Sequence, residues 1–193
     1  GHAVGRDKLF LNNDNYRFFL GRLDKYISPV ADIFAWSLLP NHFHLLIQVK
    51  PLPELIAHYK KIKPHGKEHE SWQPEFVMKR FSNLFNSYAK AFNLKNKRRG
   101  ALFMDYMRRV EVKTDAQFTA TVFYIHKNAV HHGYCMNING WPWSSYKTIL
   151  SESPAKIGRQ KVLDHFGGTE KFIEYHAQPV FLKYATAVEY EDI

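Results

Sequence analysis

His42 and His44 stand two residues apart in a stretch, PNHFHLLIQ, that otherwise has the pattern of a β-strand. Because successive side chains of a strand point to opposite faces, Phe43, Leu45 and Ile47 would share an apolar face and the two histidines the other. The imidazoles would then lie about 6–7 Å apart along the strand. That separation allows both to bind one divalent ion through ring nitrogens. The ordinary alternative is a pair of surface histidines on a half-exposed strand.

A second pair, Tyr124 and Asn128, is spaced by four residues in a segment with helical periodicity, so both side chains lie on one helix face. A phenol can attack a phosphodiester when a metal ion neutralises the phosphate oxygens. Two histidines leave such an ion under-coordinated, and an amide oxygen one turn from the nucleophile would complete its shell. The ordinary alternatives are a tyrosine at the edge of the core and a surface amide.

The elements that must position these residues follow from periodicity and from capping signals. Thr114 and Gln117 have the spacing of a capping box and open a helix that Gly133 ends. We predict a strand over 31–39 that pairs with the histidine strand as an antiparallel hairpin, and a strand pair or bent strand over 101–112. The stretch 64–74 is predicted to be a polar loop. Helices are predicted over 14–27, 52–63, 75–92, 115–132, 159–166 and 168–177.

Composition places the chain among basic, reduced, single-domain proteins. It has 193 residues, 45% of them hydrophobic, and a formal net charge of +9 from 27 Lys and Arg against 18 Asp and Glu. Such a domain commonly binds a polyanion, and nucleic acid is the first candidate. The single cysteine, Cys135, excludes an intrachain disulfide framework and fits a reducing compartment. No apolar run is long enough to cross a bilayer and no signal peptide pattern stands at the start, so we expect a cytoplasmic protein without a membrane partner.

Basic and aromatic side chains supply candidate contacts to DNA. Phosphate contacts would give affinity without sequence information, and aromatic rings could stack on unpaired bases. Both kinds of residue could instead be solvated surface charge and ordinary core. The basic groups are Lys60, Lys61, Lys63 and Lys67; Lys95, Lys97, Arg98 and Arg99; and Arg108 and Arg109. The aromatic candidates are Phe103, Tyr106, Trp141 and Trp143.

Three further histidines lie on the helix of Tyr124 or directly after it. His126 is about 200° around that helix from Tyr124, and we therefore interpret it as structural or as a contact made from the opposite side of the helix. His131 and His132 return to the face of Tyr124, where they could touch a DNA phosphate.

Four segments, taken in order, resemble one family. The stretch 39–47 (LPNHFHLLI) resembles the histidine–hydrophobic–histidine motif of HUH single-tyrosine transposases. The stretch 124–130 (YIHKNAV) resembles the Tyr-Ile-His-x-Asn-Pro-Val motif of their REP-associated branch. Between them, 100–103 (GALF), followed by Arg108 and Val112, is similar to the branch's Gly-x-Leu-Phe/Trp segment, and 143–146 (WSSY) resembles its Trp-Ser-Ser-Tyr. The resemblance covers about residues 3 to 175.

This resemblance implies a fold and a reaction. The fold would be α+β, a ferredoxin-like antiparallel sheet with helices packed on one face, in a catalytic domain over 1–150. A short helical extension over 151–193 would pack on or beside that domain. The family cleaves and rejoins single-stranded DNA, here hairpin-forming and REP-like, through a 5′-phosphotyrosine. Tyr124 would be the nucleophile, and His42, His44 and Asn128 would hold Mg²⁺ or Mn²⁺. The protein would act as a monomer or a homodimer.

Two departures from the family pattern leave other functions open. Ala129 stands where the branch has proline, and the residues from Gly1 to Val4 stand near the place where the family's first strand finishes. The chain could therefore be a DNA-hairpin-binding module of the same ancestry that does no chemistry. A metal hydrolase using His-x-His is a third class. The barrel amidohydrolases need a longer chain, and a cupin needs more strands than we predict.

Overall fold

The computed structural model describes residues 1–5, 7–66, 72–104 and 107–179. Among the sequence-predicted residues, Lys67, Tyr106 and the part of the extension from 180 to 193 lie outside this description. No helix within the described ranges is long and apolar enough to span a membrane. In chain order the elements are α1 (Asn13–Tyr26), β1 (Ala31–Leu38), β2 (Phe43–Val49), α2 (Leu52–Ile62), α3 (Trp72–Lys95), α4 (Asp115–His131), the 3₁₀ turn η1 (Ile138–Gly140), α5 (Tyr146–Leu150), α6 (Arg159–Phe166) and α7 (Thr169–Ala177).

The predicted hairpin is confirmed as a two-stranded antiparallel sheet of β1 and β2. Leu38 pairs with Phe43 and Ile33 with Ile47, but Ala35 pairs with Leu46, so Phe34 is an extra residue in β1. Such a bulge bends the strand locally and changes the side-chain alternation. Phe34 and Ala35 consequently both join the core on the side of the sheet that α4 covers.

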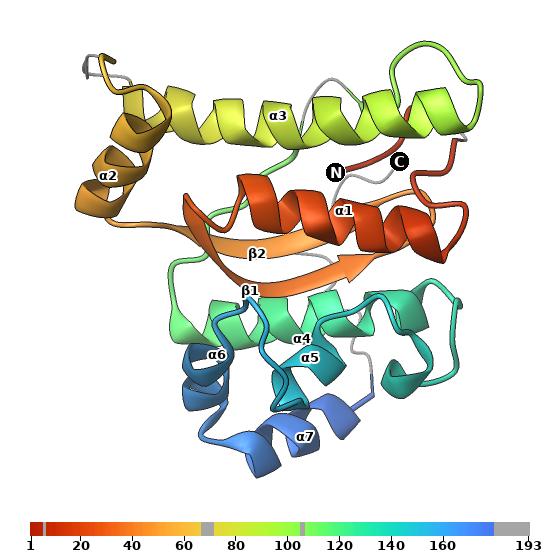
Figure 1. Cartoon of the computed structure of the whole chain (residues 1–193). Helices are drawn as coiled ribbons and strands as arrows, with labels where there is room; N and C mark the ends of the chain where they lie inside the picture. Colours follow the sequence, from red (N-terminus) through yellow and green to blue (C-terminus); the bar gives the residue numbers. More distant parts are fainter. Residues whose placement is uncertain (6, 67–71, 105–106, 180–193) are drawn as a thin grey trace.

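Helices cover both faces of this sheet, and the prediction that they pack on one face is wrong (Figure 1). On one side Ile33 and Phe43 belong to a core with Phe19 of α1 and Leu84 of α3. The other side carries a second core, whose members include Phe34, Leu46, Val122, Val162 and Phe172. The physical reason lies in β1, whose sequence ADIFAWSL is apolar at nearly every position and therefore needs cover on both faces.

The predicted helix signals act as expected at α4. The Thr114 hydroxyl accepts a hydrogen bond from the backbone N–H of Gln117 at 3.1 Å, and the Gln117 side chain accepts one from the N–H of Lys113 at 2.8 Å. Gly133 follows the helix with φ +71°, the left-handed conformation that favours glycine. These local contacts fix where α4 begins and ends, and so where Tyr124 and Asn128 lie along it.

Two predictions about secondary structure are wrong, one about a strand and one about the start of a helix. No strand forms in the described part of 101–112; Phe103 makes a single antiparallel bridge, to Ala3. An alternating pattern makes a strand only where the backbone finds a partner, and here only the residues next to the N-terminal segment find one. Helix α3 begins at Trp72, before Pro74 rather than after it. Proline is tolerated there because the first four N–H groups of a helix have no partner inside the helix.

Candidate functional site

The two histidines lie at the start of β2, on the side of the sheet that faces α4. His44 belongs to β2 itself, and His42 precedes the strand in an antiparallel bridge with His2. Their ring centroids are 5.2 Å apart and the rings are nearly perpendicular, at 86°. The imidazoles are therefore close enough to act on one group.

Helix α4 brings Tyr124 and Asn128 against these histidines. The side-chain oxygen of Asn128 lies 3.2 Å from Nε2 of His42, and its amide nitrogen donates to the Tyr124 hydroxyl at 3.2 Å. The Tyr124 ring packs edge-on against the His44 ring, with centroids 5.4 Å apart. Asn128 is fully buried and Tyr124 is 5% exposed. The structure thus joins the four sequence-predicted residues into one contiguous cluster.

Both imidazoles of the cluster are neutral at physiological pH. Burial, with His2 and His132 close by, lowers the pKa of His42 to about 3. Burial and the neighbouring His42 ring hold the pKa of His44 well below its usual value. A neutral imidazole keeps one nitrogen lone pair, which is the form that binds a metal ion.

The contacts of His42 constrain which nitrogen carries its proton. Nδ1 of His42 lies 2.9 Å from the side-chain oxygen of Asn41, and a neutral ring has one N–H to donate. If Nδ1 donates to Asn41, the Nε2 lone pair faces Asn128. The Nε2 lone pair and the Asn128 side-chain oxygen then lie 3.2 Å apart, as two neighbouring donor atoms. Asn41 thereby orients His42 as outer residues orient metal-binding histidines.

His44 supplies the observation that best fits a bound ion. Its Nε2 is buried and has no hydrogen-bond partner, which is rare for a buried polar atom. Within the described ranges, no three His, Cys, Asp or Glu side chains are grouped so as to hold a metal ion. The cluster instead offers two imidazole nitrogens and the amide oxygen of Asn128, a donor set that suits a divalent ion held only weakly.

Three further residues lie next to the cluster, and sequence reasoning missed two of them, His2 and Asn41. His2 stacks on His42, with centroids 4.9 Å apart and planes 15° from parallel. Helical spacing placed His132 on the face of Tyr124, and there its ring approaches that of His42 edge-on, with centroids 5.0 Å apart. Asn41 adjoins His42 in the chain, and its amide was a usable signal, whereas nothing in the sequence pointed to His2.

His126 faces away from the cluster and belongs to a buried chain of hydrogen bonds. The carbonyl of Phe172 can only accept, so His176 donates to it from Nδ1 at 2.7 Å and accepts at Nε2 from Nδ1 of His126 at 3.0 Å. Nε2 of His126 then accepts from the Ser145 hydroxyl at 2.8 Å, and that hydroxyl accepts the backbone N–H of Trp36 at 2.9 Å. These hydrogen bonds tie β1, α4 and α7 together. His126 lies two residues after Tyr124 and has a structural role in this network, as interpreted from its position on the helix.

This buried pair of histidines predicts a loss of stability in acid. Burial holds the pKa of His126 well below its usual value and lowers that of His176 to about 4. Below about pH 6.5 the unfolded chain therefore binds more protons than the folded chain, and the free energy of unfolding should fall increasingly steeply as the pH drops toward 4, by up to about 1 kcal/mol per pH unit for each group. His176→Gln should be less stable than the unaltered chain at pH 7.5 but lose less stability on acidification. Urea unfolding at pH 7.5, 6 and 5 measures how the free energy of unfolding changes with pH for the unaltered chain and for His176→Gln. Equal pH dependence in the two proteins would contradict the conclusion that buried His176 is neutral in the folded state.

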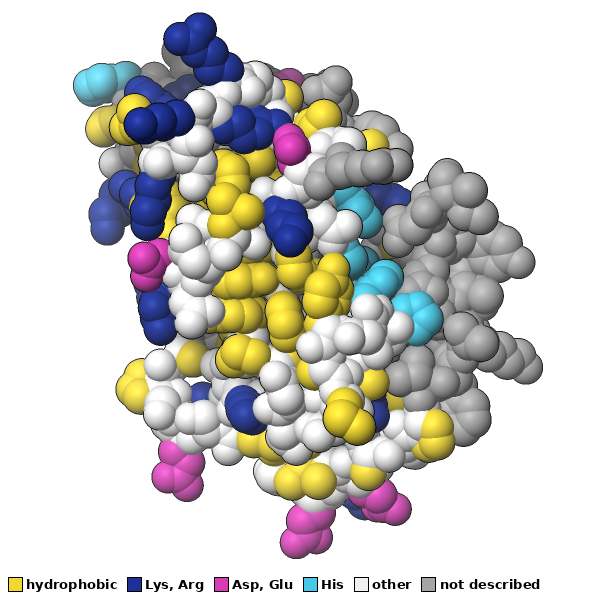
Figure 2. All heavy atoms as spheres, turned by 90° about the vertical axis from the view of Figure 1, so that its right-hand side faces the viewer, with side chains coloured by type: hydrophobic (Ala, Val, Ile, Leu, Met, Phe, Trp, Pro, Cys, Tyr) yellow, Lys and Arg dark blue, Asp and Glu magenta, His cyan; other side chains and the backbone are white. Residues whose placement is uncertain are grey.

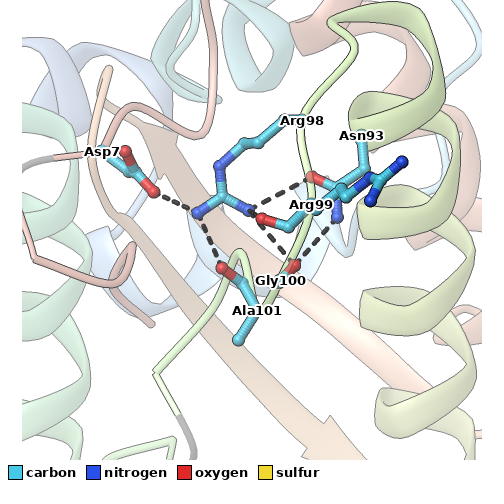
Figure 3. Close-up of polar contacts among 6 residues, drawn as sticks. All are labelled: Asp7, Asn93, Arg98, Arg99, Gly100 and Ala101. Atoms are coloured by element: carbon cyan, nitrogen blue, oxygen red, sulfur yellow. Dashed lines mark hydrogen bonds and ion pairs between the residues drawn. The ribbon is translucent and has the colours of Figure 1, made fainter.

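Arg98 contributes to the fold of the turn after α3 rather than to an open basic surface (Figure 3). Its guanidinium pairs with the Asp7 carboxylate and donates to the carbonyl oxygens of Ala101 at 2.7 Å and Gly100 at 3.2 Å, and to the Asn93 side chain at 3.2 Å. The Arg98 side chain is 23% exposed. These contacts engage both terminal nitrogens of its guanidinium within the chain.

The remaining basic residues are spread over separate places. Arg99 and Lys97 are exposed at the turn after α3, and the ammonium of Lys95 lies 3.5 Å from an Asp14 oxygen. Arg108 and Arg109 instead line a hollow of about 800 Å³ beside β2, together with His44. The lysines 60, 61 and 63 lie on or directly after α2, at the opposite end of α3 from the basic turn (Figure 1). The lysines of α2 and the turn after α3 are thus separated by the length of α3.

Comparison with known proteins supports the fold. No protein-family model matches the chain, and no curated protein sequence matches it. A solved structure of a REP-associated tyrosine transposase bound to a REP hairpin is similar to it, with a TM-score of 0.51 over 80% of this chain and 79% of that chain. The two sequences are 18% identical over this match. The resemblance seen in the sequence motifs is therefore confirmed at the level of the fold.

Proposed function

We propose that this chain is a REP-associated member of the HUH single-tyrosine transposases, which cleaves and rejoins hairpin-forming single-stranded DNA through Tyr124. The observation that carries the proposal is the unbroken contact from His42 through Asn128 to the Tyr124 hydroxyl, with His44 against the phenol ring. The four ordered motifs and the shared fold support it. All four residues come from one chain, so a monomer would suffice and exchange of the tyrosine helix between subunits is not required.

The finer fold that we propose is ferredoxin-like. The bridges His2–His42 and Ala3–Phe103 are both antiparallel. They place the N-terminal segment beside the start of β2 and the segment around Phe103 beyond it. With β1 on the other edge of β2, the lateral order is the fourth, first, third and second β-segment of a β-α-β-β-α-β chain. This is the order of a ferredoxin-like sheet, with α1 and α3 as its two connecting helices and α4 on the opposite face.

In the proposed reaction the Tyr124 oxygen attacks the phosphorus of a phosphodiester. A bond forms between that oxygen and phosphorus, the bond to the 3′ oxygen breaks, and the leaving oxygen takes a proton to become a 3′-hydroxyl. The phenolic proton passes from the Tyr124 hydroxyl to solvent water, and the leaving 3′ oxygen takes its proton from the same source. Asn128 fixes the direction in which that hydroxyl points. Attack of a 3′-hydroxyl on the phosphotyrosine reverses the steps, rejoins the strand and restores the phenol.

The residues that would hold Mg²⁺ or Mn²⁺ are His42, His44 and Asn128. Both imidazoles are neutral, the buried Nε2 of His44 lacks another partner, and Asn41 leaves Nε2 of His42 as the donor atom. When bound, the ion would neutralise phosphate charge that the neutral side chains cannot. The protein's own part is to hold the phenol and the donor atoms in one buried arrangement.

Arg98 and Arg99 are predicted to behave differently although they are adjacent. Arg99→Ala removes an exposed charge and should weaken DNA binding for all sequences alike, lowering the slope of log affinity against log salt by about one. Arg98→Ala removes the contacts that hold the turn and should lower the free energy of unfolding by about 1–3 kcal/mol. Binding measured at four salt concentrations and urea unfolding separate the two effects. If Arg99→Ala leaves the salt slope unchanged, this turn does not lie on the DNA path.

The test of the function uses a labelled DNA hairpin with single-stranded flanks and Mg²⁺ or Mn²⁺. A covalent protein–DNA band on a denaturing gel, lost with a chelator, is the expected result. A mobility shift on a native gel without a covalent band would instead support the alternative, a hairpin-binding module that does no chemistry. If neither a mobility shift nor a covalent band is seen, both of these functions are excluded and a metal hydrolase is the remaining candidate.

A further inference from the structure

A second hollow, of about 470 Å³, lies at the end of the molecule where α1 begins and α4 ends. Its aromatic and basic lining includes Lys8, Tyr16, Tyr134, Trp141 and Trp143, and Pro40 also lines it. We refer to it as the aromatic pocket. Its volume falls within the range of about 300–1,000 Å³ that is typical of small-ligand sites. Figure 2 faces this end of the molecule and shows a band of hydrophobic side chains with histidine side chains beside it and Lys and Arg above.

The inner walls of the aromatic pocket are held rigidly. The Trp143 ring stacks on Tyr16 with centroids 4.5 Å apart and planes 6° from parallel, and Tyr16 stacks in turn on Phe10 at 4.5 Å. The indole N–H of Trp141 donates to the backbone carbonyl of Leu38 at 3.0 Å. These rings are therefore oriented before any ligand arrives, which reduces the entropy lost on binding.

Tyr134 forms the outer wall. Its ring lies 5.5 Å from that of Trp141 at an angle of 36°, and 43% of the residue is exposed. It stands in the turn after α4, outside both cores. A large aromatic side chain that stays half-exposed beside two tryptophans offers a flat face to a ligand from solvent.

The charges around the aromatic pocket suit an anionic chain that carries flat rings. Lys8 is exposed at its edge, and the Arg17 guanidinium lies 6.0 Å from the centre of the Trp143 ring. Arg17 also pairs with Asp14 at 3.5 Å, but no Asp or Glu of the described chain lines the pocket itself. Aromatic faces stack on nucleobases whatever their identity, while lysine and arginine contact the linking phosphates.

The aromatic pocket lies within reach of a strand held at Tyr124. Pro40, which lines the pocket, precedes His42 by two residues. Helix α4 rises by about 10 Å from Tyr124 to His131, and Tyr134 lies in the turn directly after it. Along this path His132 contacts His42. A DNA strand could thus run from the four-residue cluster to the aromatic pocket over a few nucleotides.

We infer that the aromatic pocket binds one unpaired nucleobase of the strand that Tyr124 engages, with Lys8 on the adjacent phosphate. The inference rests on the proposed function, since it takes its ligand from the same DNA. Beyond the proposed function, the aromatic pocket would contact a base that is extruded from the hairpin or flanks it, separate from the paired part of the hairpin. Stacking of one base would raise the affinity by roughly 5- to 150-fold.

The test places 2-aminopurine, a fluorescent base, at each unpaired position of a hairpin flank in turn. With saturating protein, one position should be quenched far more than the others because its base stacks on the tryptophan and tyrosine rings. Tyr134→Ala should abolish that quench and weaken binding by about tenfold. Tyr134→Phe should keep both, because the ring remains. Met136→Ala is the matched control, since Met136 is 98% exposed in the same turn but does not line the pocket.

An abasic substitution at the quenched position completes the test. It should weaken binding to the unaltered chain by the same factor as Tyr134→Ala and weaken binding to Tyr134→Ala no further. The affinity of Tyr134→Ala is compared with that of the unaltered chain for the intact strand and for the abasic strand. If the substitution weakens binding to both strands by the same factor, the residue acts on the fold and the inference is wrong. Covalent adduct formation with no quenched position would overturn the inference and leave the proposed function standing. Failure to bind the hairpin at all would overturn both.

Discussion

Tyr124→Phe is expected to bind hairpin DNA as tightly as the unaltered chain and to form no covalent adduct. The substitution removes one oxygen and keeps the ring that packs against His44. The Asn128 amide loses one hydrogen-bond partner, which should lower the free energy of unfolding by only about 1 kcal/mol. Cleavage should fall below detection because phenylalanine has no oxygen to form the phosphotyrosine bond. Native and denaturing gels run on the same samples measure binding and the adduct.

Tyr134→Phe is the matched control for this loss. Tyr134 is the next described tyrosine along the chain after Tyr124, and its hydroxyl has no role in the proposed reaction. Its phenylalanine variant should form the adduct at the normal rate. An adduct with Tyr124→Phe would show that another tyrosine is the nucleophile. Cleavage without any adduct would instead indicate that water attacks the phosphate.

His44→Ala is expected to raise the divalent ion concentration needed for half-maximal cleavage by at least about tenfold. Loss of a residue that only orients a metal ligand typically has an effect of that order. Nε2 of His44 has no hydrogen-bond partner that the substitution could break, so the fold should persist. Because mass action can refill a weakened site, high Mn²⁺ should partly restore cleavage. It should not restore Tyr124→Phe. Mn²⁺ titration followed by electron paramagnetic resonance gives a second readout that does not depend on cleavage.

His58→Ala is the matched control for the histidine. Nε2 of His58 is also buried without a hydrogen-bond partner, but His58 lies on α2, away from the cluster. Its removal should leave the metal requirement unchanged. His42→Ala should be more disruptive than His44→Ala, because His42 also contacts Asn41 and Asn128. If His44→Ala and His58→Ala need the same ion concentration, His44 is not a ligand.

Most of the helices were predictable because their information is local. In α1 and α4 the apolar residues recur at helical spacing, and a capping side chain marks each start, Asn12 for α1 and Thr114 for α4. The stretch 101–112 also alternates, but strand formation depends on a partner elsewhere in the chain, and only the residues around Phe103 have one. The same dependence on distant segments explains the error about the faces of the sheet.

The basic turn after α3 shows that local sequence also does not decide which basic residues are available to bind DNA. A run of lysines and arginines indicates an electrostatic surface whatever its conformation, and Arg99 is exposed as that pattern suggests. Arg98 is not, because Asp7, 91 residues away in the chain, meets it in the fold. No local pattern distinguishes these two neighbours.

By itself the sequence determined the two pairs of the candidate site. A strand repeats every two residues and a helix every 3.6, so the spacing alone places His42 with His44 and Tyr124 with Asn128 on single faces. Only the tertiary structure decided that the two faces meet, through the packing of α4 on β1 and β2, and that Asn41, His2 and His132 surround His42. The physical reason is range: backbone geometry fixes neighbours within one element, whereas contacts between elements depend on how their apolar faces are buried together.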